Sequence, residues 1–158
     1  MKKALFLDID GVFNIASGSN LTYIKKGVHL EDEIIALFDK MLLDKDFDII
    51  ISSSWRSDME DLKEILCSHN FKSIDKIKGF TELDSQGSGF RNIQIINFLQ
   101  NNKYDKYAVL DDDFSLFFNQ DKLSFHQNIN IDNLVLTDSK IGLTRDDLLE
   151  VSKLLDIN

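Results

Sequence analysis

The sequence predicts a three-layer α/β sandwich with a Rossmann-like, mainly parallel sheet of about five strands. Short apolar runs alternate with longer segments of helical spacing along the chain, which is the order of strand and helix in a parallel sheet. The first run consists of consecutive apolar residues, as in a strand buried on both faces. Polar residues follow several runs directly, as they do at the carboxyl edge of such a sheet.

The composition fits one globular domain over residues 1–158. A chain of this length, with 43% hydrophobic residues, can bury about two thirds of its unfolded surface. The net charge of −9 argues against broad binding of nucleic acid, which usually needs a basic surface, although a local basic groove remains compatible with it. The one cysteine, Cys67, is expected to be a small core residue on a helix.

Nothing in the sequence indicates export or a membrane. The first strand begins directly after Met1-Lys2-Lys3, which leaves no room for a signal peptide. No apolar run approaches the length of about 18 residues that a membrane span needs. We therefore expect a cytoplasmic protein with no membrane partner and no obligate protein partner.

The first strand, residues 4–7, ends in a candidate site. Asp8 and Asp10 follow it, and side chains two apart on an extended segment point the same way. Gly11 then lets the backbone turn sharply away. Two carboxylates this close need a cation or a shared proton. A solvated turn is the plain alternative, whereas a calcium loop needs further oxygen ligands that the following residues do not supply.

The remaining elements follow in order. Residues 12–26 are rich in Ser, Asn and Gly and predict a small hairpin or flap, and His126 in the aromatic-rich connection 114–132 is expected on the surface or in packing. Thr144 and Asp147 have the spacing of a helix cap. Apolar spacing predicts helices over 28–44, 58–69 and 90–101 and after Thr144, and strands over 47–51, within 71–80, and over 107–110 and 133–137.

Hydroxyl groups follow the strand over 47–51. Ser52, Ser53 and Ser54 stand where a helix starts, so their hydroxyls and the backbone N–H groups form a natural oxyanion pocket. A loop with a helix cap is the alternative function of such a serine run.

A second acidic group follows the strand over 107–110. Asp111 and Asp112 would reach the same sheet edge as Asp8 and Asp10. Two acidic pairs at one edge are less easily explained by chance than a single pair. Arg91 opens the helix over 90–101, where the helix dipole favours anions. Its position makes sense if it faces an anion or the carboxylates.

In order and context these residues resemble the four motifs of the haloacid dehalogenase (HAD) superfamily of phosphohydrolases. The motifs are Asp8-Ile9-Asp10-Gly11, a serine after the next long strand, Arg91 at a helix start, and Asp111-Asp112. Asp-Gly-Val-Phe-Asn, Ser-Ser-Ser-Trp-Arg and Gly142-Leu143-Thr144 look like the small branch described as phosphatase domains of Swiss Army knife RNA-repair proteins. The resemblance spans nearly the whole chain.

The resemblance implies a Mg²⁺-dependent phosphatase that acts through an aspartyl phosphate. Asp8 would attack phosphorus, and Asp10 would protonate the leaving alkoxide and later take a proton from water. Mg²⁺ would be held by the Asp8 carboxylate, the Asp10 backbone carbonyl and Asp111. Asp112 would bind the metal through water or orient other groups.

The resemblance also implies a set of phosphate ligands. Arg91 would grip phosphate or an aspartate with its forked guanidinium. One serine hydroxyl would contact phosphate, with Ser53 favoured and Ser52 next. Arg56 either reaches phosphate or makes a surface salt bridge, and Trp55 is either a core anchor or a platform for a base.

The intervals in which this superfamily inserts lids, 12–47 and 55–90, are largely occupied by the predicted helices and strands. We therefore expect at most a small flap and no large cap domain. An open site suits a large substrate, such as a polynucleotide end or a phosphoprotein. Of these two substrate classes, the polynucleotide end is slightly favoured. A small-metabolite phosphatase, a phosphotransferase and a non-catalytic Mg²⁺-binding partner protein stay as alternatives. A response-regulator receiver is disfavoured, because its acids would be adjacent and a lysine would stand near the last strand.

Overall fold

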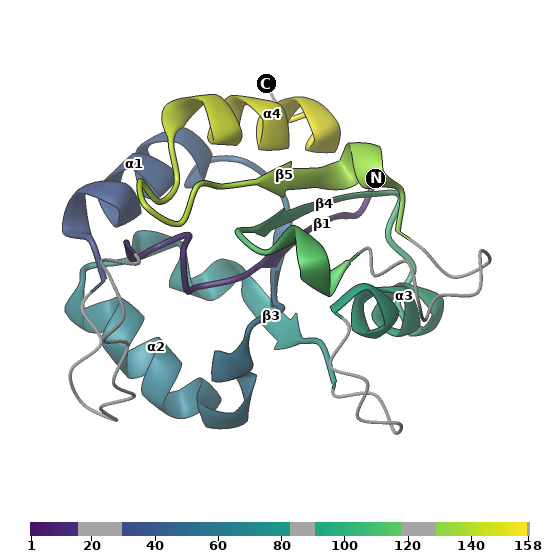
Figure 1. Ribbon diagram of the computed structural model, residues 1–158, viewed down its shortest axis with the longest axis horizontal. Helices are drawn as coiled ribbons and strands as arrows, with labels where there is room; N and C mark the ends of the chain where they lie inside the picture. The colour runs from purple at the N-terminus through teal and green to yellow at the C-terminus, as the bar shows by residue number, and fades with distance from the viewer. Residues whose placement is uncertain (16–29, 83–90, 118–128, 158) are drawn as a thin grey trace.

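The computed structural model describes residues 1–15, 30–82, 91–117 and 129–157. Its centre is a sheet of five strands in the order β3-β2-β1-β4-β5, all parallel (Figure 1). The strands are β1 (Lys3–Leu7), β2 (Asp48–Ile51), β3 (Ile77–Phe80), β4 (Lys106–Asp111) and β5 (Leu134–Leu136). The α-helices of the described ranges are α1 (Asp32–Leu42), α2 (Met59–Ser68), α3 (Arg91–Asn101) and α4 (Arg145–Leu155). The predicted α/β fold is confirmed.

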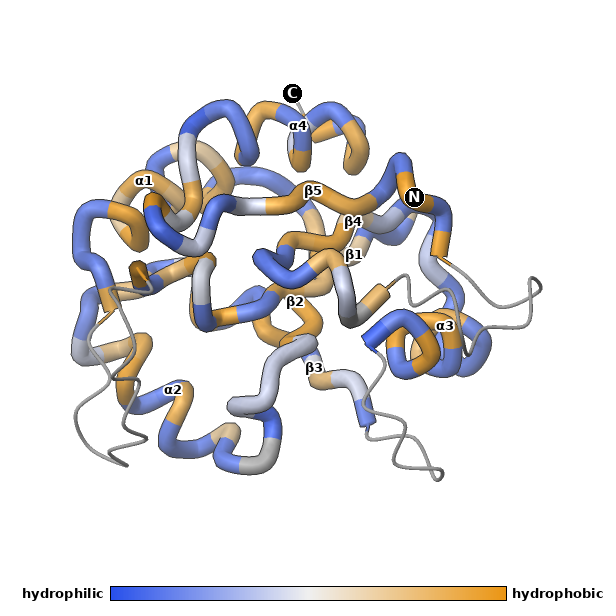
Figure 2. Tube along the Cα trace, viewed as in Figure 1, coloured by the Kyte–Doolittle hydropathy of each residue, from blue (hydrophilic) through white to orange (hydrophobic). Residues whose placement is uncertain are grey.

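Both faces of the sheet are apolar and covered by helices. On β1, Leu5 and Leu7 share a core with buried residues of α1, α2 and α4, while Ala4 and Phe6 share the opposite core with α3. Because successive side chains of a strand alternate between faces, a strand covered on both sides is apolar at every position. Figure 2 shows this apolar colour along β1, β4 and β5, between helices of mixed hydropathy.

The order of the strands fixes where the site lies. The chain builds β1, β2 and β3 in one direction, and then returns to add β4 and β5 on the other side of β1. The switch between β1 and β4 is the position at which open α/β sheets bind ligands. The parallel ladder also continues past the strands, with Asp8 N donating to Leu110 O at 3.0 Å and Ser52 N to Leu7 O at 2.8 Å. The first residues after β1 and β2 are therefore fixed in register.

The predicted strand within 71–80 is shorter than that interval, because residues Lys72–Lys76 form a 3₁₀ helix before β3. The buried carboxylate of Asp39 in α1 accepts hydrogen bonds from Lys72 N at 2.7 Å and from Ser73 N at 3.0 Å. These bonds satisfy backbone donors at the start of the 3₁₀ helix and give the buried carboxylate its partners.

The predicted core position of Cys67 is wrong. The side chain is exposed and its thiol is free. Helix α2 buries Leu62 and Leu66, and each further residue turns the side chain by about 100° around the helix axis. Cys67 therefore faces away from the core that Leu66 enters.

Several predictions concern residues beyond the described ranges. Most of the predicted flap over 12–26 and His126 lie outside them. The described residues contain no large cap domain, as predicted. Their helices are all too short or too polar to cross a membrane. The single domain over 1–158 and the cytoplasmic location stay predictions.

The cap of α4 is the one predicted from the sequence. Thr144 Oγ1 accepts a hydrogen bond from Asp147 N at 3.3 Å, and Asp147 Oδ2 accepts one from Thr144 N at 2.8 Å. These two bonds form a capping box, which satisfies two backbone donors at the helix start.

Replacing Thr144 with alanine should lower the free energy of unfolding by about 1 kcal/mol, because it removes the cap acceptor. Urea unfolding followed by circular dichroism measures this loss. Arg145→Ala, at the exposed first residue of the same helix, should change stability by less than about 0.5 kcal/mol. Equal effects of the two substitutions would show that the cap contributes nothing specific.

Candidate active site

The carboxyl edge of the sheet brings three of the predicted acids together. Asp8 follows β1, Asp111 ends β4, and Asp112 comes next. One carboxylate oxygen from each lies within 4.8 Å of the others. This trio is called the acid cluster below. Sequence spacing alone could not show it, because Asp8 and Asp111 meet only through the pairing of β1 with β4.

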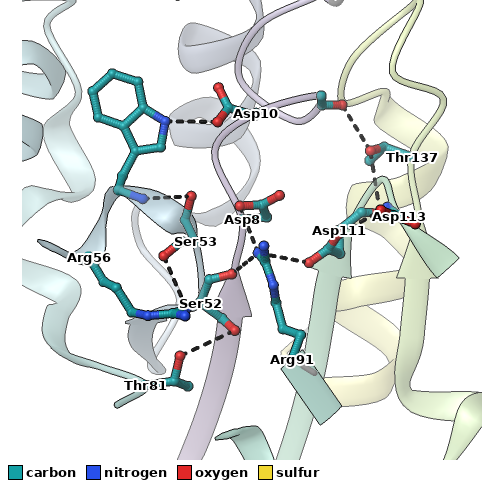
Figure 3. Close-up of polar contacts among 12 residues, drawn as sticks. Asp8, Asp10, Ser52, Ser53, Arg56, Thr81, Arg91, Asp111, Asp113 and Thr137 are labelled. Carbon is teal, nitrogen blue, oxygen red and sulfur yellow. Dashed lines mark hydrogen bonds and ion pairs between the residues drawn. The ribbon is translucent and has the colours of Figure 1, made fainter. Parts of the chain in front are cut away.

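Arg91, the first residue of α3, reaches into the acid cluster (Figure 3). Its Nη1 atom lies 2.8 Å from Asp8 Oδ1 and 3.1 Å from Asp111 Oδ2. The same nitrogen donates to the backbone carbonyl of Ser52. Arg91 therefore does face a carboxylate cluster, and these carboxylates offset the unfavourable position of a cation at a helix start.

One guanidinium does not balance three carboxylates. Burial raises the pKa of the Asp8 carboxyl, while the charge of Arg91 and a hydrogen bond with Ser53 act in the opposite direction. Burial and then the charge of Asp8 raise the pKa of Asp111 to about 8 and that of Asp112 to about 6. For Arg91, burial lowers the pKa, but the neighbouring Asp8 and Asp111 carboxylates leave it raised overall. With its three carboxylates ionised, the acid cluster would carry more negative charge than Arg91 offsets, and the raised pKa values reflect this.

The donor set fits a divalent cation. The Oδ2 atom of Asp111 is buried and accepts no hydrogen bond, although Nη1 of Arg91 is close to it. Its other oxygen accepts from Asp113 N at 3.0 Å. A hard cation with a preference for carboxylate oxygens would supply the missing partner and the missing positive charge. Asp10 was expected to contribute only its backbone carbonyl to such an ion, and that expectation stays a prediction.

The Asp10 carboxylate stands apart from the acid cluster. Its Oδ1 accepts a hydrogen bond from Asn14 Nδ2 at 2.9 Å, and its Oδ2 accepts one from Trp55 Nε1 at 3.0 Å. Trp55 also packs against the core, as expected of an anchor. Sequence analysis did not find either contact to Asp10, because 45 residues separate Trp55 from Asp10 and no motif marks Asn14.

The three serines after β2 have different surroundings. Ser52 is buried, and its hydroxyl accepts from Thr81 Oγ1 at 3.5 Å. Ser53 is also buried; its hydroxyl bonds with Asp8 and accepts from Trp55 N at 3.4 Å, so that it caps the 3₁₀ helix Ser54–Asp58. Ser54 is exposed. The hydroxyl that reaches the acid cluster is that of Ser53, the serine favoured from the sequence.

Arg56 brings a second guanidinium to this edge. Its Nη1 donates to the backbone carbonyl of Ser53 at 3.1 Å, and the residue is half-buried. Burial and then the charge of Arg91 lower the pKa of Arg56, while the Asp8 carboxylate opposes them. Arg56 therefore lies within electrostatic reach of both Asp8 and Arg91.

The turn after β1 is tightly enclosed. Gly11 has φ +71°, and a Cβ atom there would lie 2.2 Å from Asp112 Oδ2. The Gly11 carbonyl accepts from Thr137 Oγ1 at 3.0 Å, and Thr137 N in turn donates to Asp111 O at 2.9 Å. Thr137, which directly follows β5, thus links the two acidic loops. Its role was not evident in the sequence, because a threonine at a strand end carries no motif.

The sheet carries one acidic loop after its central strand and another after the adjacent strand, with the Arg91 guanidinium buried between them, and this arrangement is that of a HAD-like domain. The family model described as "HAD domain in Swiss Army Knife RNA repair proteins" matches residues 4–148, and the chain belongs to this family. The family supports a phosphatase of the HAD type in general and commonly uses a metal ion. No curated protein and no solved structure gave a significant match.

Gly11→Ala should lower the free energy of unfolding by more than about 1 kcal/mol, because alanine is strained at positive φ and would meet the Asp112 carboxylate. Displacement of Asp112 should also weaken the binding of a divalent cation to the acid cluster by about 10- to 100-fold, measured with Mg²⁺ in titration calorimetry.

Gly79→Ala is the matched control. Among the described residues, a Cβ atom at Gly79 would meet only the Phe98 ring, at 3.9 Å, so this variant should keep the wild-type affinity for Mg²⁺. Unchanged Mg²⁺ affinity in Gly11→Ala would contradict the link between the turn and Asp112.

Proposed function

We propose that the protein is a Mg²⁺-dependent phosphatase that hydrolyses a phosphomonoester through an aspartyl phosphate on Asp8. The observation that carries this proposal is the buried Asp8 carboxylate, held between Arg91 and the other acids of the cluster. Asp8 lies at the switch between β1 and β4, the position at which open α/β sheets bind ligands. Membership of the HAD family supports the same chemistry.

Each step of the reaction has a group in reach of this edge. A carboxylate oxygen of Asp8 attacks phosphorus, the bond from phosphorus to the leaving oxygen breaks, and Asp10 gives its proton to that oxygen. Water then attacks phosphorus and gives a proton to Asp10, and the bond from phosphorus to Asp8 breaks. Phosphate leaves, and both side chains return to their initial states.

The remaining residues supply charge. Mg²⁺ held by Asp8, Asp111 and the Asp10 backbone carbonyl, with Asp112 nearby, would offset the negative charge of the phosphate and of the cluster. Arg91 favours the ionised form of Asp8 that a nucleophile needs, against the effect of burial, and its remaining N–H groups can face phosphate oxygens.

Further phosphate donors come from the segment after β2. The Ser53 hydroxyl, with Ser52 beside it, and the Arg56 guanidinium are the candidates for phosphate oxygens. Such prearranged donors stabilise the charge that spreads over the phosphoryl oxygens in the transition state.

A polynucleotide end is the substrate class we place first. The family is described by RNA repair, and the described residues contain no cap that would enclose a small metabolite. Two guanidinium groups near Asp8 also suit a substrate with more than one phosphate. The net charge of −9 weighs against broad affinity for nucleic acid and favours recognition of the end itself. Phosphate release from 3′- and 5′-phosphorylated oligonucleotides, phosphopeptides and sugar phosphates, compared at equal concentration, tests this order.

Asp8→Asn should abolish phosphate release from an aryl phosphate while preserving the fold, because the amide cannot form the acyl phosphate. The wild type should lose its activity in EDTA and regain it when Mg²⁺ is added. Asp113→Asn is the control, because Asp113 caps the 3₁₀ helix after β4 and lies outside the acid cluster. Near-normal turnover of Asp8→Asn would contradict the role of Asp8. Mg²⁺ binding without any release by the wild type would favour a binding protein instead.

Arg91→Ala should weaken inhibition by vanadate, because it removes a cation from the phosphate site. It should also cost about 3–5 kcal/mol of stability, since Asp8 and Asp111 lose the cation buried between them. Arg91→Lys keeps the charge but loses the forked guanidinium, so it should also weaken vanadate inhibition, and it allows the measurement if the alanine variant does not fold. The exposed Arg145→Ala should leave vanadate inhibition unchanged. Wild-type affinity for vanadate in Arg91→Lys and Arg91→Ala would contradict this role.

A further inference from the structure

The carboxylate of Asp10 is held from two sides by nitrogen donors. Trp55 Nε1 lies 3.0 Å from Oδ2, and Asn14 Nδ2 lies 2.9 Å from Oδ1. The Asn14 amide can face only one way, because its own Oδ1 accepts from Gly11 N at 2.7 Å and must be the oxygen. Both donors therefore point at Asp10 in a defined orientation (Figure 3 draws the bond from the unlabelled indole ring to the labelled Asp10).

Both donors are themselves fixed by their surroundings. Asn14 is buried, with 5% of its surface exposed, and Trp55 packs against the main core. Trp55 is the second residue of the 3₁₀ helix Ser54–Asp58, and its backbone N–H donates to the capping Ser53 hydroxyl. The turn that carries Asp10 is closed by a hydrogen bond from Phe13 N to Ile9 O at 2.9 Å. The geometry around Asp10 is thus set by buried side chains and backbone bonds.

A half-buried tryptophan generally finds some acceptor for its N–H group, so the contact alone could be structural. Two features indicate more than this. The acceptor is the carboxylate that the proposed mechanism needs for proton transfer, and that carboxylate is separate from the acid cluster. A carboxylate has about four lone-pair sites, so one N–H donor on each oxygen leaves room for a proton.

We propose that Trp55 is a positioning residue for Asp10: its indole N–H holds the Asp10 carboxylate where it transfers a proton to the leaving oxygen. The inference rests on the proposed phosphatase function. In the first step, the proton moves from Asp10 to the oxygen whose bond to phosphorus breaks, and the electron pair of that bond stays on this oxygen. Trp55 itself exchanges no proton and touches no reacting atom.

The test is the dependence of kcat/KM on the leaving group in Trp55→Phe, which keeps a ring in the core and removes the N–H. The substrates are a series from 4-nitrophenyl phosphate, whose leaving group needs little protonation, to alkyl phosphates, whose leaving group needs a proton. Since kcat/KM covers the steps up to departure of the leaving group, later steps do not obscure the result. We expect a loss of about 10- to 100-fold for alkyl phosphates, the cost of a misplaced catalytic group. The loss for 4-nitrophenyl phosphate should stay below about threefold, so the dependence on the leaving group becomes steeper.

Tyr104→Phe is the matched control. It also removes a polar hydrogen from an aromatic ring, where the Tyr104 hydroxyl donates to Asp48 Oδ2 at 2.9 Å. Asp48 begins β2 and therefore lies at the sheet edge opposite the site. Tyr104→Phe should keep the wild-type dependence on the leaving group. The proposal would be overturned if Trp55→Phe lost kcat/KM equally for all substrates or lost none. It would also be overturned if Tyr104→Phe showed the same steeper dependence of kcat/KM on the leaving group. A wild type that cleaves no substrate would instead refute the proposed function, and this inference with it.

A spectroscopic measurement keeps the proposal testable if Trp55→Phe does not fold. Trp55 is the chain's single tryptophan, so the indole N–H band in the ultraviolet resonance Raman spectrum reports on it alone. In Asp10→Ala this band should move to the position of a weaker hydrogen bond. An unchanged band would show that the indole has another acceptor in solution and would overturn the proposal.

Discussion

The buried ion pairs of Arg91 with Asp8 and Asp111 are the interaction on which the rest of the site depends. A carboxylate pair at this depth is costly unless a cation lies between its members. Arg91 supplies that cation from the start of α3, a helix on the opposite face of the sheet from α1 and α4. Residues from β1, β4 and α3 are therefore held in one small volume before any substrate or metal binds. The excess negative charge that remains is the physical reason to expect a divalent cation.

The backbone around this cluster limits how far it can relax. Parallel-ladder bonds fix Asp8 and Ser52 at the ends of their strands, and the Thr137 hydroxyl ties the β1 turn to the loop after β4. Asp10 is held separately, by Trp55 and Asn14. The site thus keeps the proposed nucleophile inside the charged cluster and the proposed proton donor outside it, between two neutral N–H donors.

The fold and the acidic residues could be predicted from the sequence because their signals are local. A continuous apolar run followed by Asp8, and another followed by Asp111, indicate two buried parallel strands, and parallel strands end at a common edge. The contacts of Trp55 and Thr137 could not be predicted, since they depend on how distant loops pack. Cys67 was misplaced because its apolar neighbours suggested a buried face that ends at Leu66. The 3₁₀ helix before β3 could not be predicted, because the carboxylate that accepts from its first backbone donors, Asp39, comes from another helix.

The central claim is that phosphate passes through a covalent bond to Asp8, and chemical trapping tests it most directly. The wild-type protein is mixed with Mg²⁺ and an aryl phosphate and quenched during turnover with borohydride, which reduces an acyl phosphate to an alcohol. Peptide mass spectrometry then locates the change. The account predicts reduction at position 8 that depends on both substrate and Mg²⁺. Phosphate release without any change at position 8, or with the change on another residue, would contradict it.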